Sequence, residues 1–244
     1  MAVVTEPVRA APDVDRAVAA GGAILVGTAA GLIAVLHVVA PELPPLWSMI
    51  SDYALGPYRP LFDVAVLTLA AGSGAVLLAL IRTGLLRGSS GSVALLATWC
   101  VAMPVVVAFP TCYCRTEVTT AGVVHAVASL TGFLTLPLAA LRMGSRWCDH
   151  PLWWRHAACV RVLGVVALGW LAPMLLGVVP VAALTGPLWA VVPFGLVERG
   201  LAVVEVAVLL VLSAWAARAA AVPQPVLSQP VLSQPDPPGS SCRA

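Results

Sequence analysis

The sequence has 244 residues, of which 60% are hydrophobic and only 10% are charged, whereas a soluble domain carries roughly 25% charged residues. A chain this apolar cannot cover itself with polar surface in water, which excludes an ordinary soluble protein and favours the lipid bilayer as solvent. The net charge of +2 is too small to suggest nucleic acid as a partner, and no basic cluster with interleaved aromatic residues occurs.

The first apolar segment follows a polar amino terminus, residues 1–18, which we predict to be a disordered cytoplasmic tail. Ala19–Val39 contains no charged residue and has the length that a bilayer crossing requires. Within it, Gly27 and Gly31 have the spacing at which small residues let a second helix approach closely. His37, near its far end, is expected to bond a carbonyl or water.

The second and third spans are separated from the first by a proline-rich loop. Five prolines between Pro41 and Pro60 forbid a continuous helix there. The second span is predicted at Leu61–Ile81, with Asp63 in its first turn, where an acid complements the helix dipole. The third, Val93–Phe109, is short, and Pro104 is expected to bend it.

The connector after the third span gathers the residues best suited to chemistry. It contains Pro110 and then Cys112, Cys114, Arg115 and Glu117. The fourth span is predicted at Thr119–Leu141, with a threonine as its cap. This places His125 in its second turn, just below the membrane surface.

Two further spans complete the membrane domain, 19–218. Ala157–Val181 is predicted to be a bent helix, and Val197–Ala217 begins with Glu198 and Arg199. Glu205 lies seven residues after Glu198 and therefore on nearly the same helical face. Residues 219–244 contain a PVLSQ repeat whose prolines exclude helix and sheet, which predicts a disordered tail.

The arginines predict the orientation. An even number of spans places both termini on one side, and ten of the 13 basic residues, all arginine, fall on that side. The positive-inside rule therefore predicts cytoplasmic termini in a multi-pass protein of the cytoplasmic membrane. We expect Asp52, His125, Glu198 and Arg199 to converge in one outward cavity, with Arg199 pairing an acid; the alternative is that each residue is merely interfacial. The full candidate polar cluster is Asp52, Asp63, Arg115, His125, Glu198, Arg199 and Glu205.

Three short motifs lie at the ends of the predicted spans: ISDYALGPYRPLFD begins the second span, AFPTCYC and VTTAGVVHAVAS join the third span to the fourth, and GLVERG begins the sixth. Taken together, they resemble a bacterial membrane family called domain of unknown function 998. The resemblance covers residues 19–218 and implies a six-helix membrane domain of unassigned activity. It implies functional weight on Ser51, Asp52, Tyr53, Phe109, Pro110, His125, Glu198 and Arg199. One position departs from the family pattern: Cys112 stands where an acid is expected after the Phe-Pro pair, so no acid or metal role is carried over to it.

Several functions stay open at this point. A membrane-embedded hydrolase could hold Zn²⁺ with His125 and Asp52, Asp63 or Cys112, although no HxxxH or CxxC spacing occurs. Cys112 and Cys114 could take part in thiol chemistry on the oxidising side. Glu205 within a span favours a transporter or a protein that binds a small molecule, lipid or ion. A structural or regulatory protein is equally compatible. The sequence implies no particular cofactor, and the lipid bilayer is the one partner it predicts.

Overall fold

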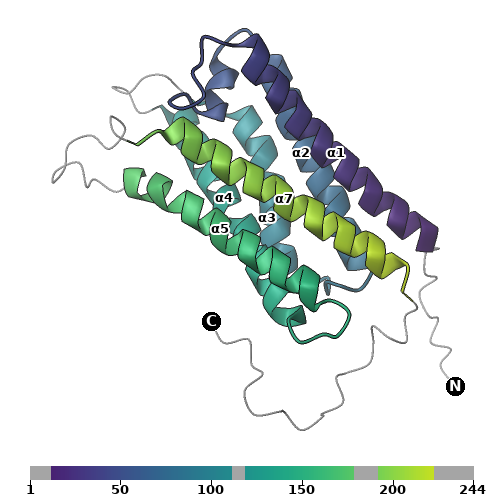
Figure 1. Ribbon diagram of the computed structural model, residues 1–244. Coiled ribbons are helices and arrows are strands. Elements are labelled where there is room, and N and C mark those ends of the chain that lie inside the picture. Colours follow the sequence, from purple (N-terminus) through teal and green to yellow (C-terminus); the bar gives the residue numbers. More distant parts are fainter. Residues whose placement is uncertain (1–11, 112–118, 179–191, 223–244) are drawn as a thin grey trace, which may run out of the picture.

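The computed structural model describes residues 12–111, 119–178 and 192–222, which form one elongated helical bundle (Figure 1). Within these ranges there is no strand, and each of the six long helices is long and apolar enough to cross a membrane. The all-helical, six-span prediction is therefore confirmed. The helices are α1 (Pro12–Val39), α2 (Arg59–Arg82), α3 (Gly91–Ala108), α4 (Thr120–Trp147), α5 (Trp154–Val178) and α7 (Phe194–Ala220), with a short 3-10 helix, η1 (Ile50–Leu55), between α1 and α2.

The six helices close into a ring in chain order. Each packs against its neighbours in sequence, and α7 completes the ring by packing between α5 and α1. α7 also contacts α2 and α4 across the bundle, so it forms part of the interior as well. The first turn of α1 and the last turn of α7 lie at the same end (Figure 1). The loop with η1 lies at the opposite end.

The outer face of the bundle is apolar. Val38 on α1 and Val203 on α7 are 78% and 68% exposed, respectively. A soluble protein rarely leaves a continuous belt of such side chains in water, because large exposed apolar patches mark contact with a membrane or a partner. The fold therefore places the chain in a lipid bilayer as a multi-pass protein.

Two glycines set the close approach of α1 to α2. A Cβ on Gly22 would lie 2.9 Å from the Val76 side chain, and one on Gly72 would lie 3.0 Å from the Val26 backbone nitrogen. The predicted pair, Gly27 and Gly31, does not have this role, because a Cβ at either position meets nothing within 4 Å. The close contact between α1 and α2 lies nearer the start of α1, at Gly22, and not at the predicted pair.

The predicted tail is too long. Residues 12–18 form the first two turns of α1 rather than a disordered segment. Asp15 is buried in this part of the helix and accepts a 2.6 Å hydrogen bond from Arg82 Nε at the end of α2. This ion pair lets a polar helix start pack against the bundle, which hydropathy along the sequence does not reveal.

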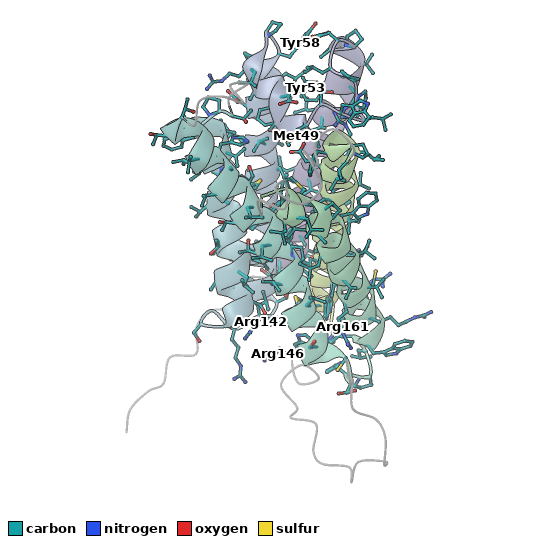
Figure 2. The ribbon with its side chains drawn as sticks, turned by 90° about the vertical axis from the view of Figure 1, so that its left-hand side faces the viewer. Met49, Tyr53, Tyr58, Arg142, Arg146 and Arg161 are labelled. Carbon is teal, nitrogen blue, oxygen red and sulfur yellow. The ribbon has the colours of Figure 1, made fainter. Side chains whose placement is uncertain are left out.

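Histidine and tryptophan rings pack together between α4 and α5, at the end of the bundle that carries Arg142, Arg146 and Arg161 (Figure 2). The His150 ring packs edge-on against Trp147 and stacks on Trp153, with centroid distances of 5.1 and 6.3 Å. His150 Nδ1 also accepts a 3.3 Å hydrogen bond from the Leu152 amide. Partial burial lowers the pKa of His150 below its ordinary value of 6.5.

We predict that His150 makes the protein less stable in acid. Because its pKa is lower in the folded protein, the unfolded chain binds the proton first as the pH falls through 6.5. This contribution to the free energy of unfolding is complete above that pH and decreases below it. Thermal unfolding in detergent from about pH 8 to about pH 5 should show a shallower decline for His150→Gln than for the unaltered protein. Identical slopes would contradict the assignment.

Candidate ligand-binding cavity and its polar cap

A cavity with a volume of about 660 Å³ lies inside the helical ring. Helices α1, α2, α3, α4 and α7 form its walls, and η1 contributes Ile50 and Ser51 at one end. Its lining is predominantly apolar, with Phe62, Trp99 and Phe133 as the aromatic members. A volume of this size and an apolar lining are typical of small-molecule sites.

Arg199 organises the polar end of the cavity. Its Nε donates to His37 Nε2 at 2.6 Å, and Nη1 donates to the Ser48 carbonyl at 2.5 Å and the Gly195 carbonyl at 2.9 Å. Nη2 reaches the Tyr53 hydroxyl at 3.5 Å. The guanidinium therefore ties together α1, η1 with its preceding loop, and its own helix α7.

These contacts show which ring nitrogen of His37 carries the proton. Its Nδ1 lies 2.7 Å from the Ile33 carbonyl, so it must carry the proton and donate. Nε2 is then the lone-pair acceptor that Arg199 needs, which makes the ring neutral. The prediction that His37 bonds a carbonyl agrees with this geometry. Its second hydrogen bond, from Arg199, could not be predicted from the sequence.

Two acids hold the start of η1. Glu198, buried in the second turn of α7, accepts a hydrogen bond from the Ile50 amide, and Asp52 accepts one from the Met49 amide at 2.8 Å. Helix starts leave amide donors without partners, and carboxylates satisfy them well. Glu198 and Asp52 thus fix η1 over the end of the cavity. We call His37, Ser48, Tyr53, Glu198 and Arg199 the polar cap; Figure 2 shows Tyr53 at this end of the bundle, opposite the labelled arginines.

The loop between α1 and η1, which we call the cap loop, packs directly on the start of α7. Leu196 donates its backbone N–H to the Leu46 carbonyl at 3.1 Å. A Cβ on Gly195 would lie only 2.6 Å from the Pro45 carbonyl oxygen and closer still to that of Ser48. Glycine is therefore required at this position, because backbone rather than a mobile side chain fills the space.

The cavity lining includes residues of α1 and α7 that are also exposed on the outside of the bundle. Ala34 on α1 and Val203 on α7 both line it, and both are exposed on the outside of the bundle. Each lies about one helical turn from a member of the polar cap, on the hydrocarbon side: Ala34 precedes His37, and Val203 follows Arg199. An opening between these two residues would face the hydrocarbon of the bilayer.

Glu205 is the deepest acid in the cavity wall. It is 2% exposed, and its Oε1 has no hydrogen-bond partner among the described residues. It follows Glu198 by seven residues, which places it about 10 Å further along α7. The expectation that the two acids share a face agrees with the cavity lining, which includes both.

The other predicted site residues are located elsewhere. His125 is buried on α4 but is not part of the cavity lining; its Nδ1 lies 2.8 Å from the Phe109 carbonyl and 3.3 Å from that of Val106. It therefore bonds the last carbonyls of α3, which a helix end leaves free. Asp63 pairs with Arg59 one turn earlier on α2, at 3.4 Å.

Arg115, Cys112, Cys114 and Glu117 lie outside the described residues. Among the described residues, no group of three or more His, Cys, Asp or Glu side chains is placed to hold a metal ion. The hydrogen bonds described for Arg199 lead to a histidine, a phenol and two carbonyls rather than to the acid we expected. The structure therefore brings Glu198, Arg199 and Glu205 to one cavity, with Asp52 beside it on η1.

A family model described as a protein of unknown function, DUF998, matches residues 18–215. This chain belongs to the DUF998 family. The resemblance noted in the sequence is thus confirmed, and the membrane domain matches the DUF998 family along nearly all its length. Comparison with curated proteins and with solved structures gave no significant match.

The structure gives the three DUF998-like motifs of this chain a physical meaning. Asp52 and Tyr53 of the first motif belong to η1, and the Glu198–Arg199 pair of the third anchors η1 to α7. The second motif ends α3 at Phe109 and returns through His125, which bonds the Phe109 carbonyl. Two of the motifs meet at the polar cap, and the second fixes the α3–α4 corner.

Proposed function

We propose that this protein binds a lipophilic small molecule that it takes up from the bilayer. The observation that carries the proposal is the cavity of about 660 Å³, which has apolar walls and whose lining includes the exposed residues Ala34 of α1 and Val203 of α7. Its volume lies within the range of sites that enclose a drug-sized molecule. An apolar ligand dissolved in lipid would reach it without passing through water.

The polar cap supports a binding role over a hydrolytic one. The described bonds of Arg199 go to protein groups, and Glu198 is bonded to the Ile50 amide. Groups engaged in this way hold a structure in place and are not available as an acid–base pair. We therefore assign the cap to closing the end of the cavity and fixing η1 there.

We also propose that the polar cap faces outward. Arg142, Arg146 and Arg161 lie at the end of the bundle opposite to the cap (Figure 2), together with Arg82 at the end of α2. Arg59 and Arg199 are the arginines described at the cap end. This distribution supports cytoplasmic termini by the positive-inside rule. The ligand would then be drawn from the outer half of the bilayer.

Quenching of Trp99 tests the proposal, because this side chain lines the cavity. We expect 11-bromoundecan-1-ol, added to protein in lipid nanodiscs, to quench a saturable part of the tryptophan fluorescence. Trp99→Phe should remove that part, while nonsaturable quenching of tryptophans at the bundle surface, such as Trp154, remains. Ala202→Phe, which fills the cavity from α7, should weaken saturable binding.

The outcome that would refute the proposal is equally specific. If the saturable part is absent, or if it survives unchanged in both Trp99→Phe and Ala202→Phe, the cavity does not hold the probe. The melting temperature of each variant should be recorded alongside, so that a loss of binding is read only from folded protein.

A further inference from the structure

Glu205 is a buried acid that makes no described hydrogen bond through its Oε1 atom. Its carboxyl group is buried at the middle of α7, and Oε1 has no partner in the described part of the chain. Other buried polar groups nearby are satisfied: Trp99 Nε1 donates to the Ser73 hydroxyl at 2.9 Å, and Ser73 donates to the Leu69 carbonyl. Glu205 stands apart from this pattern although it lines the same cavity as Trp99.

An unpartnered acid at this depth is costly. A polar group transferred from water without a compensating hydrogen bond loses roughly 2–7 kcal/mol, and acids within spans usually pair with another group. The cap does not supply that partner, because the described bonds of Arg199 lead to His37, Tyr53 and backbone carbonyls. Because Glu205 lines the cavity, a molecule bound there can supply the missing hydrogen-bond partner.

We infer that the ligand of this cavity is a lipophilic molecule that carries a hydrogen-bond donor, a hydroxyl or ammonium group, and that Glu205 accepts this hydrogen bond. The inference rests on the proposed function, because it names the class of molecule bound at the same site. The apolar walls hold the hydrocarbon part of the ligand. Glu205 fixes its polar group inside the membrane, about 10 Å from the cap.

Three probes that share an undecyl chain and a terminal bromine separate the apolar contribution to binding from that of the hydrogen bond to Glu205. 11-Bromoundecan-1-ol and 11-bromoundecylamine carry a donor, whereas 1-bromo-11-methoxyundecane has a methyl group in place of the hydroxyl hydrogen. Binding is measured as the saturable quenching of Trp99 in nanodiscs. We expect at least one donor probe to bind about tenfold more tightly than the ether, the value of one hydrogen bond to a buried acid. If the alcohol probe binds more tightly than the amine probe, the natural ligand is an alcohol; the opposite order indicates an amine.

Replacing the acid should remove this selectivity. In Glu205→Leu the three probes should bind with equal affinity, and the ether should bind at least as tightly as to the unaltered protein. Ser129→Ala is the matched control, since Ser129 is a polar residue of the same lining on α4. It should keep the preference for a donor.

The inference and the proposed function fail in different ways. If none of the three probes gives saturable quenching of Trp99, the proposed function fails and the inference with it. If all three bind the unaltered protein equally, or if Ser129→Ala rather than Glu205→Leu removes the preference, the cavity binds lipophilic molecules but Glu205 is not its anchor. The probe comparison in the unaltered protein keeps the test decisive even if a variant does not fold.

Discussion

Replacing Arg199 by alanine should lower the free energy of unfolding by roughly 3 kcal/mol, because two or more charge-assisted hydrogen bonds are lost at once. The variant leaves the Ser48 carbonyl and His37 Nε2 without their donor. It also removes the contact between Arg199 and Tyr53 of η1, which leaves Glu198 as the α7 side chain that holds η1. We expect Arg199→Lys to recover only part of the loss, since an ammonium cannot reach acceptors on three sides as the guanidinium does.

A matched control exists at the same end of the bundle. Arg59 forms an ion pair with Asp63 on the surface of α2, at 3.4 Å, and its side chain is 45% exposed. Exposed pairs of this kind contribute about 0–1 kcal/mol, so Arg59→Ala should change stability little. Both variants are compared by unfolding in mixed detergent micelles. Equal effects of the two substitutions would show that Arg199 is not the centre of the cap.

The second large effect is expected at Gly195. In Gly195→Ala the added Cβ would meet the carbonyl oxygens of Pro45 and Ser48, and neither backbone can move without breaking the contact between the cap loop and α7. Overpacking of this kind costs about 1–3 kcal/mol, and we expect the upper end because the obstacles are backbone atoms.

Gly27→Ala provides the comparison for the same chemical change. A Cβ on Gly27 meets nothing within 4 Å, and alanine favours helix over glycine by roughly 1 kcal/mol. This variant should therefore be neutral or slightly stabilised, whereas Gly195→Ala should be destabilised under the same unfolding conditions. A Gly195→Ala protein as stable as the original would place the cap loop elsewhere.

The spans could be predicted because hydropathy is a local property of the sequence. The helices are located by long apolar runs, by the prolines between these runs and by a threonine that caps the start of α4. The start of α1 could not be predicted in this way, since residues 12–18 are polar. They are helical because Asp15 pairs with Arg82, a partner 67 residues away.

The partners within the site were the least predictable part. Glu198, Arg199 and Glu205 could be chosen from the sequence because charged residues near or within a span are rare and usually functional. Their partners could not, because His37 and the Ser48 carbonyl are 162 and 151 residues from Arg199. His125 is the opposite case. Its motif suggested a place in the site, but its ring bonds carbonyls at the end of a neighbouring helix.

The lateral opening of the cavity is the claim on which the rest depends, and labelling of single cysteines tests it most directly. Val206 lines the cavity, whereas Val208, two residues along α7, is fully buried in the packed core. In a protein whose six native cysteines are replaced by alanine, a membrane-soluble alkyl maleimide should label Val206→Cys in nanodiscs and leave Val208→Cys unlabelled. If the two positions are equally unreactive while Val203→Cys on the outer face is labelled, the cavity is closed to the bilayer and the account is contradicted.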